Sequence, residues 1–229
     1  MNNITKKLNI IAFVLALFPS LIIAQTSGGQ ITRNTSKKLN YGKGYVRGHE
    51  WVDLGLPSGL KWATCNIGAS SPDKLGNYYA WGETRVKSSY SDANYLYKDV
   101  LNGEYINLGY NISGTEYDAA HVIWGGKWRM PTLEEYQELL NECKLEWTSR
   151  KNVIGILMTG VNGNSIFFPA AGFQNGTTIG SVGSFGYYWV STLSVNYQGN
   201  AYHLYFNSQN CTMADWHRCF GLPIRPVIK

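Results

Sequence analysis

The segment Met130-Pro131-Thr132-Leu133-Glu134-Glu135-Tyr136-Gln137-Glu138-Leu139-Leu140-Asn141-Glu142-Cys143 contains the strongest helix signal in this chain, and it decides the fold class. Thr132 is followed three residues later by Glu135, which is the capping-box pattern with which many helices begin. The apolar side chains that follow recur at helical spacing, and they are Leu133, Tyr136, Leu139, Leu140 and Cys143. A second, shorter helix is expected over residues 118–124.

The sequence after this helix has the pattern of strands and turns. Strands are expected at residues 153–159, 165–169, 187–193, 201–206 and 223–228, and the Asn162-Gly163 pair favours a tight hairpin between the first two. Short strands are also expected before the helix, at residues 51–54, 60–65 and 77–82, whereas residues 83–117 are polar and irregular. One main helix, a short helix and a run of mostly antiparallel strands predict an irregular α+β fold.

Residues 152–214 contain no Asp, Glu, Lys or Arg. The polarity of this stretch therefore resides in amides, hydroxyls and phenols, which bind neutral or peptide-like partners by hydrogen bonding and aromatic contact. A nucleic-acid partner would require Lys and Arg there, so none is expected. The alternative is a β-rich extracellular domain whose surface is simply neutral.

The first residues predict export of the chain. Two lysines precede an apolar run from Leu8 to Ile23, and the small residue Ala24 follows it, so residues 1–24 are predicted to be a cleaved signal peptide. An uncleaved membrane anchor is the alternative, but Pro19 interrupts the run, which is short for a membrane span. The mature protein is expected to be secreted, to the cell surface, the periplasm or the medium, without an integral membrane span.

Residues 25–44 are predicted to form a flexible basic linker, and residues 45–229 a single domain. Seven of the 20 Lys and Arg residues precede Glu50, so the basic net charge of +5 belongs mainly to the N-terminal segments. The domain itself is nearly neutral. This distribution gives no reason to expect an acidic partner for the folded part of the chain.

Four cysteines in a secreted chain permit three disulfide connectivities. Cys211 can pair with Cys219 only if the chain turns between them, because eight residues of extended strand span roughly 26 Å. Cys65 and Cys143 would then form the second pair. If residues 211–219 are one strand, then Cys211, Met213, Asp215, His217 and Cys219 share a face, but ligands along an extended strand cannot converge on one zinc ion. A turn would allow them to converge, and it would equally allow a disulfide, which an oxidising compartment favours. No metal or cofactor is therefore expected.

Five motifs occur in order along residues 51–228. They are Trp51-Val52-Asp53-Leu54-Gly55-Leu56-Pro57-Ser58-Gly59-Leu60-Lys61-Trp62-Ala63, Tyr79-Ala80-Trp81-Gly82-Glu83, Trp124-Gly125-Gly126-Lys127-Trp128-Arg129-Met130-Pro131-Thr132, Tyr187-Tyr188-Trp189 and Ile224-Arg225-Pro226-Val227. Together they resemble the Fibrobacter succinogenes major paralogous domain, a family of secreted proteins of the Bacteroidetes type. The resemblance implies a C-type lectin-like fold, as in the formylglycine-generating enzymes and in the variable receptor proteins that retroelements diversify.

Most of these motif residues are expected to be structural. Trp62, Trp81, Trp124 and Trp128 are expected in the core, each with its indole N–H satisfied. Arg129 is expected to pair with a buried carboxylate such as Asp53 or Glu83.

In the retroelement-diversified proteins, mixed residues between framework positions of the last strands and loops form one ligand face. The residues here with that character lie between the last two motifs, and they are Ser194, Asn196, Tyr197, Gln198, His203, Tyr205, Met213, Asp215, Trp216, His217 and Phe220. The resemblance thus implies a noncatalytic recognition protein that binds a protein or glycan outside the cell. The alternative for these residues is that half of them alternate into the core, as strand residues do.

Two other functions remain open at this point. The late pair Cys211 and Cys219 allows a thiol-dependent enzyme related to the formylglycine-generating enzymes, in which His217 or Arg218 would activate a thiol. The spacing and neighbours of this pair differ from those in that family, and the chain shows no Ser-His-Asp arrangement or phosphate-binding glycine loop. A structural protein of the cell envelope is the third alternative.

Overall fold

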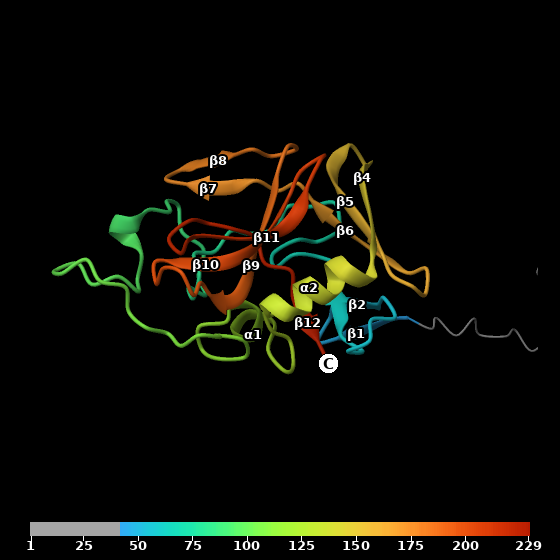
Figure 1. Ribbon diagram of the computed structural model, residues 1–229, viewed down its shortest axis with the longest axis horizontal. Coiled ribbons are helices and arrows are strands. Elements are labelled where there is room, and N and C mark those ends of the chain that lie inside the picture. Colours follow the sequence, from blue (N-terminus) through green and yellow to red (C-terminus); the bar gives the residue numbers. More distant parts are fainter. Residues whose placement is uncertain (1–41) are drawn as a thin grey trace, which may run out of the picture. The chain divides into compact units, whose positions relative to one another are not determined.

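The computed structural model describes residues 42–229 (Figure 1). The predicted signal peptide and all but the last residues of the predicted linker lie outside the described residues. The first strand, β1, spans Lys43–Val46, so the fold begins slightly earlier than the predicted domain start at residue 45.

The described chain has an α+β fold of mostly antiparallel strands with two α-helices, as predicted. The helices are α1 (Ala119–Trp124) and α2 (Leu133–Glu142), and a single 3-10 turn, η1, covers Asp92–Asn94. One sheet has the strand order β1-β2-β3-β12, with β2 at His49–Asp53, β3 at Lys61–Ala63 and β12 at Val227–Ile228. Because β12 pairs with β3, this sheet joins the two ends of the described chain.

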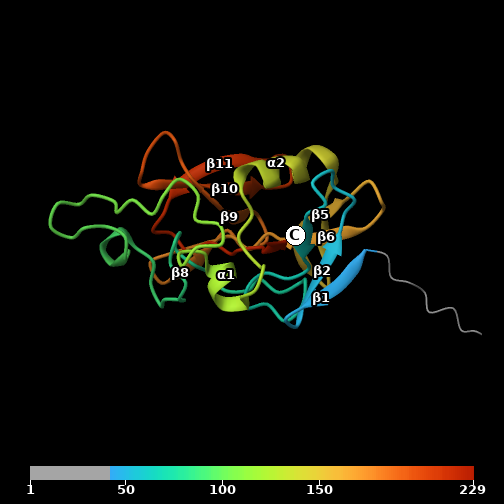
Figure 2. The ribbon, with the colours of Figure 1, turned by 90° about the horizontal axis from the view of Figure 1, so that it is seen from below.

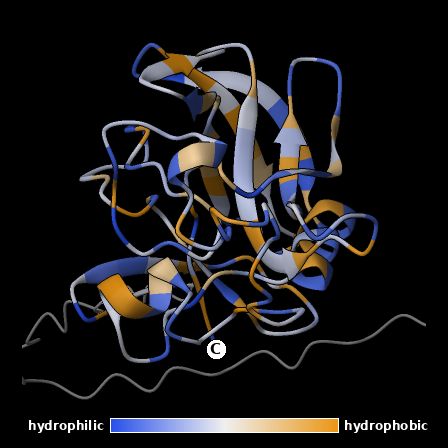
Figure 3. Ribbon diagram, turned by 90° about the vertical axis from the view of Figure 1, so that its left-hand side faces the viewer, coloured by the Kyte–Doolittle hydropathy of each residue, from blue (hydrophilic) through white to orange (hydrophobic). Residues whose placement is uncertain are grey.

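The other sheets are built from consecutive strands. The sheet β4-β5-β6 comprises Lys144–Arg150, Val153–Thr159 and Ser165–Pro169, and the small sheet β7-β8 comprises Phe173–Asn175 and Thr178–Gly180. The sheet β11-β10-β9 comprises Cys211–His217, Asn200–Phe206 and Gly186–Leu193. Along β10 buried and half-buried residues largely alternate, as expected where one face of a sheet is more buried than the other, and Figure 3 shows how polar and apolar residues are distributed over the ribbon.

Both helices begin where the sequence predicts, for local reasons. Thr132 and Glu135 form the expected capping box, in which the Thr132 hydroxyl accepts from the Glu135 N–H at 3.3 Å and the Thr132 N–H donates to Glu135 Oε2 at 2.9 Å. Helix α2 lies against the β11-β10-β9 sheet (Figure 2), with Tyr136 and Leu139 fully buried. Asp118 caps α1 by accepting from the backbone N–H groups of Ala120 and His121.

The motif tryptophans are buried, as predicted. Trp62, Trp81 and Trp128 are fully buried and Trp124 nearly so, distributed over two hydrophobic clusters. The indole N–H of Trp81 donates to the Val190 carbonyl at 2.8 Å, and that of Trp128 to the Val46 carbonyl at 3.0 Å. Trp62 differs from the expectation, because its indole nitrogen is buried without a hydrogen-bond partner.

Some element predictions were wrong. Residues 77–82 form only an isolated bridge, Tyr79 to Leu222, and 223–228 contain only the short β12. Tyr78, Tyr79, Ala80 and Trp81 are all buried, so this segment runs through the core instead of along a sheet with one covered face. The predicted strands omitted β1, β4, β7, β8 and β11, whereas the prediction that residues 83–117 lack long regular structure is confirmed.

Arg129 has a different partner from those predicted. Its guanidinium binds both oxygens of Glu135, at 2.7 and 2.5 Å, and so joins the start of α2 to the segment before it. Asp53 instead accepts from the Gly55 N–H, and Glu83 pairs with Lys87 at 2.8 Å. Glu135 is available to Arg129 because the capping box already turns its carboxylate back toward the N-terminus of the helix.

Within residues 42–229, no helix has both the length and the apolar character needed to cross a membrane.

Candidate functional site

The β11-β10-β9 sheet places two different sets of side chains on its two faces. Tyr205 of β10 lies opposite Tyr187 of β9, and His203 lies opposite Trp189. Residues directly opposite each other in an antiparallel pair share a face, so these four side chains lie on the same side of the sheet. Leu204 and its neighbours on the other side enter the hydrophobic core beneath α2.

Aromatic side chains gather on the first of these faces. We call the set Phe173, Phe185, Tyr187, His203, Tyr205, Trp216 and Phe220 the aromatic face. Ring centroids lie 5.4 Å apart for Tyr187 and Tyr205, 5.0 Å for Tyr187 and Trp216, and 4.8 Å for Trp216 and Phe220. Phe173 of β7 adds a ring 4.6 Å from that of Trp216. Apart from His203, every member is half-buried.

The predicted ligand residues that join this network are aromatic. Tyr205, His203, Trp216 and Phe220 belong to the aromatic face itself. His217 extends it through a contact with Phe220 at 5.8 Å, and Tyr197 extends it through His217 at 6.3 Å. Six of the predicted residues therefore form one connected set. They come from β10, β11 and the loops beside these strands.

The remaining predicted residues do not join the aromatic face. Met213 packs against the core cluster on the opposite side of the sheet, as the alternation of β11 requires. Asp215 lies two residues after Met213 on β11, so it is on the same side of the sheet, and it accepts a hydrogen bond from the hydroxyl of the buried Ser194. Asn196 and Gln198 are exposed in the loop between β9 and β10. Ser194 is therefore buried, whereas Met213 and Asp215 are half-buried and lie on the side of the sheet opposite the aromatic face.

His203 is the buried centre of the aromatic face. Its side chain is 3% exposed, its Nδ1 atom has no hydrogen-bond partner, and its ring lies 5.7 Å from Tyr187 and 6.0 Å from Trp216. Loss of hydration on burial lowers the pKa of His203 from 6.5 to about 4, although nearby Asp215 acts in the opposite direction. The imidazole is therefore neutral at neutral pH, and it can meet the aromatic rings without placing a charge among them.

Arg218 has a structural position that the sequence did not predict. Its side chain is 1% exposed, its Nε donates to the Tyr95 hydroxyl at 2.8 Å, and its Nη1 donates to the carbonyls of Ile106 and Gln198 at 3.2 Å. The guanidinium also lies 4.8 Å from the ring centroid of Trp81. Arg218 thus attaches the irregular segment 83–117 to the end of β11, and it is not available to an external ligand or as the activating group of a thiol.

The cysteines are separated by the sheet. Strand β11 begins at Cys211 and continues without a turn to His217, which at about 3.3 Å per residue is roughly 20 Å, whereas a disulfide needs Cα atoms within about 7 Å. The structure therefore does not bring Cys211 and Cys219 together, and all four cysteines, including Cys65 and Cys143, are unbonded.

The surroundings of Cys211 and Cys219 also differ from those of an activated thiol. Burial raises the pKa of Cys211 to about 12 and that of Cys219 to about 11. This direction reduces the thiolate fraction that a nucleophilic cysteine needs. The described part of the chain also contains no group of three or more His, Cys, Asp or Glu side chains that could hold a metal ion.

Sequence reasoning missed part of the aromatic face. Phe173, Phe185 and Tyr187 precede the predicted segment 194–220, and they are placed beside Trp216 and Tyr205 only by the pairing of β9 with β10 and by the short β7. A usable signal was present, because Phe185 and Tyr187 alternate at strand spacing within the charge-free stretch.

Comparison with known proteins finds no relative of this chain. No protein-family model matches the chain, and neither the curated proteins nor the solved structures searched contain a match.

Proposed function

We propose that this chain is a secreted or surface-exposed, noncatalytic recognition protein that binds a neutral protein or glycan ligand through the aromatic face. The observation that carries the proposal is the connected set of half-exposed rings on one side of the β11-β10-β9 sheet. Half-exposed aromatic side chains offer large contact areas at a small cost in rotamer entropy, because they have only two side-chain torsions.

The absence of ionic side chains on this face supports a neutral ligand. The members of the aromatic face carry no formal charge at neutral pH, because His203, the only titratable base among them, is held neutral by burial. The hydroxyls of Tyr187 and Tyr205 supply hydrogen-bonding groups at the edge of the rings. Stacking combined with phenol hydrogen bonds suits the apolar face and hydroxyl groups of a sugar, or the side chains and amides of a peptide.

The proposal includes a C-type lectin-like fold and kinship with the Fibrobacter succinogenes major paralogous domain. Contacts between the motifs support it. Val227 of the last motif lies opposite Trp62 of the first, and Arg129 of the third bridges to Val227. The Trp189 indole N–H of the fourth motif donates to the Tyr79 carbonyl of the second at 2.7 Å. The five motifs thus meet in one framework that carries the aromatic face.

A variable protein diversified by a retroelement is one form of this function. Tyr205 and Trp216 lie on strands between framework motifs, where substitutions can change the ligand without changing the core. Close relatives would then vary at these positions and keep Trp189 and Arg225 constant. Equal variation inside and outside the aromatic face would contradict this form of the proposal.

The test compares ligand binding by two aromatic variants. A glycan array and a panel of bacterial and host surface proteins would be probed with the wild-type chain, with the double variant Trp216→Ala/Phe220→Ala and with Tyr110→Ala. Tyr110 is 54% exposed and lies outside the aromatic face, so it is a matched control for loss of an exposed ring. We expect the double variant to lose binding and Tyr110→Ala to retain it. Equal binding by all three proteins would show that the aromatic face is not the ligand site.

A further inference from the structure

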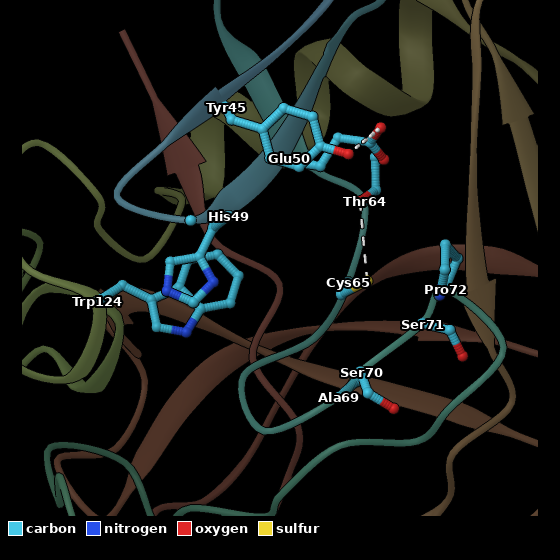
Figure 4. Close-up of a pocket in the computed structure, with 11 residues that line it drawn as sticks. Tyr45, His49, Glu50, Thr64, Cys65, Ala69, Ser70, Ser71, Pro72 and Trp124 are labelled. Atoms are coloured by element: carbon cyan, nitrogen blue, oxygen red, sulfur yellow. Dashed lines mark hydrogen bonds between the residues drawn. The ribbon is translucent and has the colours of Figure 1, made fainter.

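A second surface feature, distinct from the aromatic face, is a cavity of about 320 Å³ beside the β1–β2 hairpin (Figure 4). Its walls come from this hairpin, from the segment that follows β3, from the loop at residues 69–72 and from the end of α1. Small-molecule sites in proteins have volumes of about 300–1,000 Å³, so this cavity has room for a ligand of monosaccharide size.

One wall of the cavity is a flat, neutral aromatic surface. The imidazole of His49 stacks on the Trp124 indole, with ring centroids 3.7 Å apart and planes 6° apart. Trp124 is nearly buried, so the half-buried His49 presents the accessible ring. Burial lowers the pKa of His49, which keeps the imidazole uncharged at neutral pH. Arg47 holds this wall in place by donating from Nε to the Trp124 carbonyl at 2.9 Å.

The opposite part of the cavity carries one carboxylate and several hydroxyls. Glu50 is the only residue among those that line the cavity with an ionic side chain at neutral pH. Its Oε1 atom accepts from the Tyr45 hydroxyl at 3.2 Å, and no Lys, Arg or His lies within ion-pair distance of it in residues 42–229. Thr64, Ser70 and Ser71 also line the cavity, and Ser70 is exposed at its rim.

We propose that this cavity binds an amino sugar with a free amino group. The ammonium group would pair with the Glu50 carboxylate, whose second oxygen has no hydrogen-bond partner within the described chain. The ring hydroxyls would bind Thr64, Ser70 and Ser71, and the C–H face of the sugar would lie on His49. An anionic ligand would instead meet an uncompensated carboxylate, and a purely apolar ligand would leave the hydroxyls without partners.

The experiment measures D-glucosamine binding to the full-length protein by calorimetry and by amide chemical shifts. We expect D-glucosamine to perturb the amides near Glu50 and Thr64. N-acetyl-D-glucosamine and D-glucose, which have similar rings but no cationic group, are expected to bind about tenfold more weakly, because each lacks the charged hydrogen bond. Nα-acetyl-L-lysine, which has the ammonium group without the sugar ring, is also expected to bind more weakly.

Variants locate the site. Glu50→Gln keeps the side-chain shape and is expected to weaken D-glucosamine about tenfold. Glu146→Gln removes an exposed carboxylate of β4 outside the cavity and is expected to have no effect. Ser70→Tyr, which places a ring at the exposed rim, is expected to block binding without changing any charge.

Three results would overturn the proposal. They are no detectable binding of D-glucosamine, equal binding by Glu50→Gln, and equal binding of N-acetyl-D-glucosamine. Equal affinity for Nα-acetyl-L-lysine would overturn the assignment of a sugar. The proposal is independent of the proposed function, because Trp216→Ala/Phe220→Ala is expected to bind D-glucosamine like the wild type even though it loses the ligand of the aromatic face.

Discussion

Acidification is expected to destabilise this protein through His203 before it protonates most carboxylates. The imidazole is 3% exposed and its Nδ1 has no hydrogen-bond partner, so a proton on it would add a charge that water cannot reach. Desolvation lowers the pKa of His203 from 6.5 to about 4 in the folded protein. Unfolding exposes the ring and restores its ordinary affinity for protons, so acid favours the unfolded chain.

The pKa difference sets the size of the effect. The pKa of His203 is lower in the folded protein than in the unfolded chain. Its contribution to the free energy of unfolding is therefore fully present above about pH 6.5, and it is lost as the pH falls toward about 4. A difference of about 2.5 units corresponds to about 3 kcal/mol in total, and between about pH 7 and about pH 4.5 the expected loss is about 2.5 kcal/mol. A loss of that size is a large fraction of the 5–15 kcal/mol stability that is typical of folded domains.

The assay is urea unfolding at equilibrium, followed by tryptophan fluorescence at several pH values. His203→Gln removes the titratable group, so we expect its free energy of unfolding to change by about 2.5 kcal/mol less than that of the wild type over this pH range. Other titrating groups contribute to both proteins and cancel in the difference. Asn196→Ala, at an exposed position in the loop between β9 and β10, removes no titratable group, so it is the control and should follow the wild type. Parallel pH curves for the wild type and His203→Gln would refute the reasoning.

Three further predictions concern Asp118, Arg225 and the pair Cys211 and Cys219. Asp118→Ala should lower the free energy of unfolding by about 3 kcal/mol, because the carboxylate caps α1 and also accepts from the N–H groups of Gly114 and Met130; Asp118→Asn should cost less in the same urea assay. Arg225→Lys should cost about 2 kcal/mol in that assay, because a lysine cannot replace the planar guanidinium that donates three hydrogen bonds to two segments, residues 63–66 and β6, and an unchanged unfolding midpoint would contradict this role. Peptide mapping of the non-reduced protein should show no disulfide between Cys211 and Cys219, and finding one would contradict the continuous strand β11.

Local patterns predicted much of the secondary structure correctly. The capping box at Thr132 and the apolar runs of β5 and β6 on either side of Asn162-Gly163 are encoded within a few residues, so their boundaries agree with the structure. The failures come from segments whose neighbours are distant in sequence. Residues 77–82 have the composition of a strand, but residues 78–82 are all buried, and Tyr79 pairs only with the distant Leu222.

The candidate site shows the same division. The sequence located a mixed set of residues near the C-terminus, and strand alternation implied that part of the set would turn inward. The sequence could not show which residues turn inward, because alternation along β11 separates two faces without revealing which of them α2 covers. Packing of α2 against the sheet turned Met213 into the core, left Trp216 on the aromatic face and brought Phe173 from β7 beside it.

By itself, the sequence determined the α+β class, the two helix starts and the burial of the motif tryptophans. These depend on backbone capping, side-chain periodicity and the hydrophobic effect, which act over short stretches or on single residues. Tertiary structure alone decided that Arg129 pairs with Glu135, that Arg218 is buried, and that His49 and Glu50 line one cavity. Those outcomes depend on which distant segments meet, and many different contacts are compatible with the same local pattern.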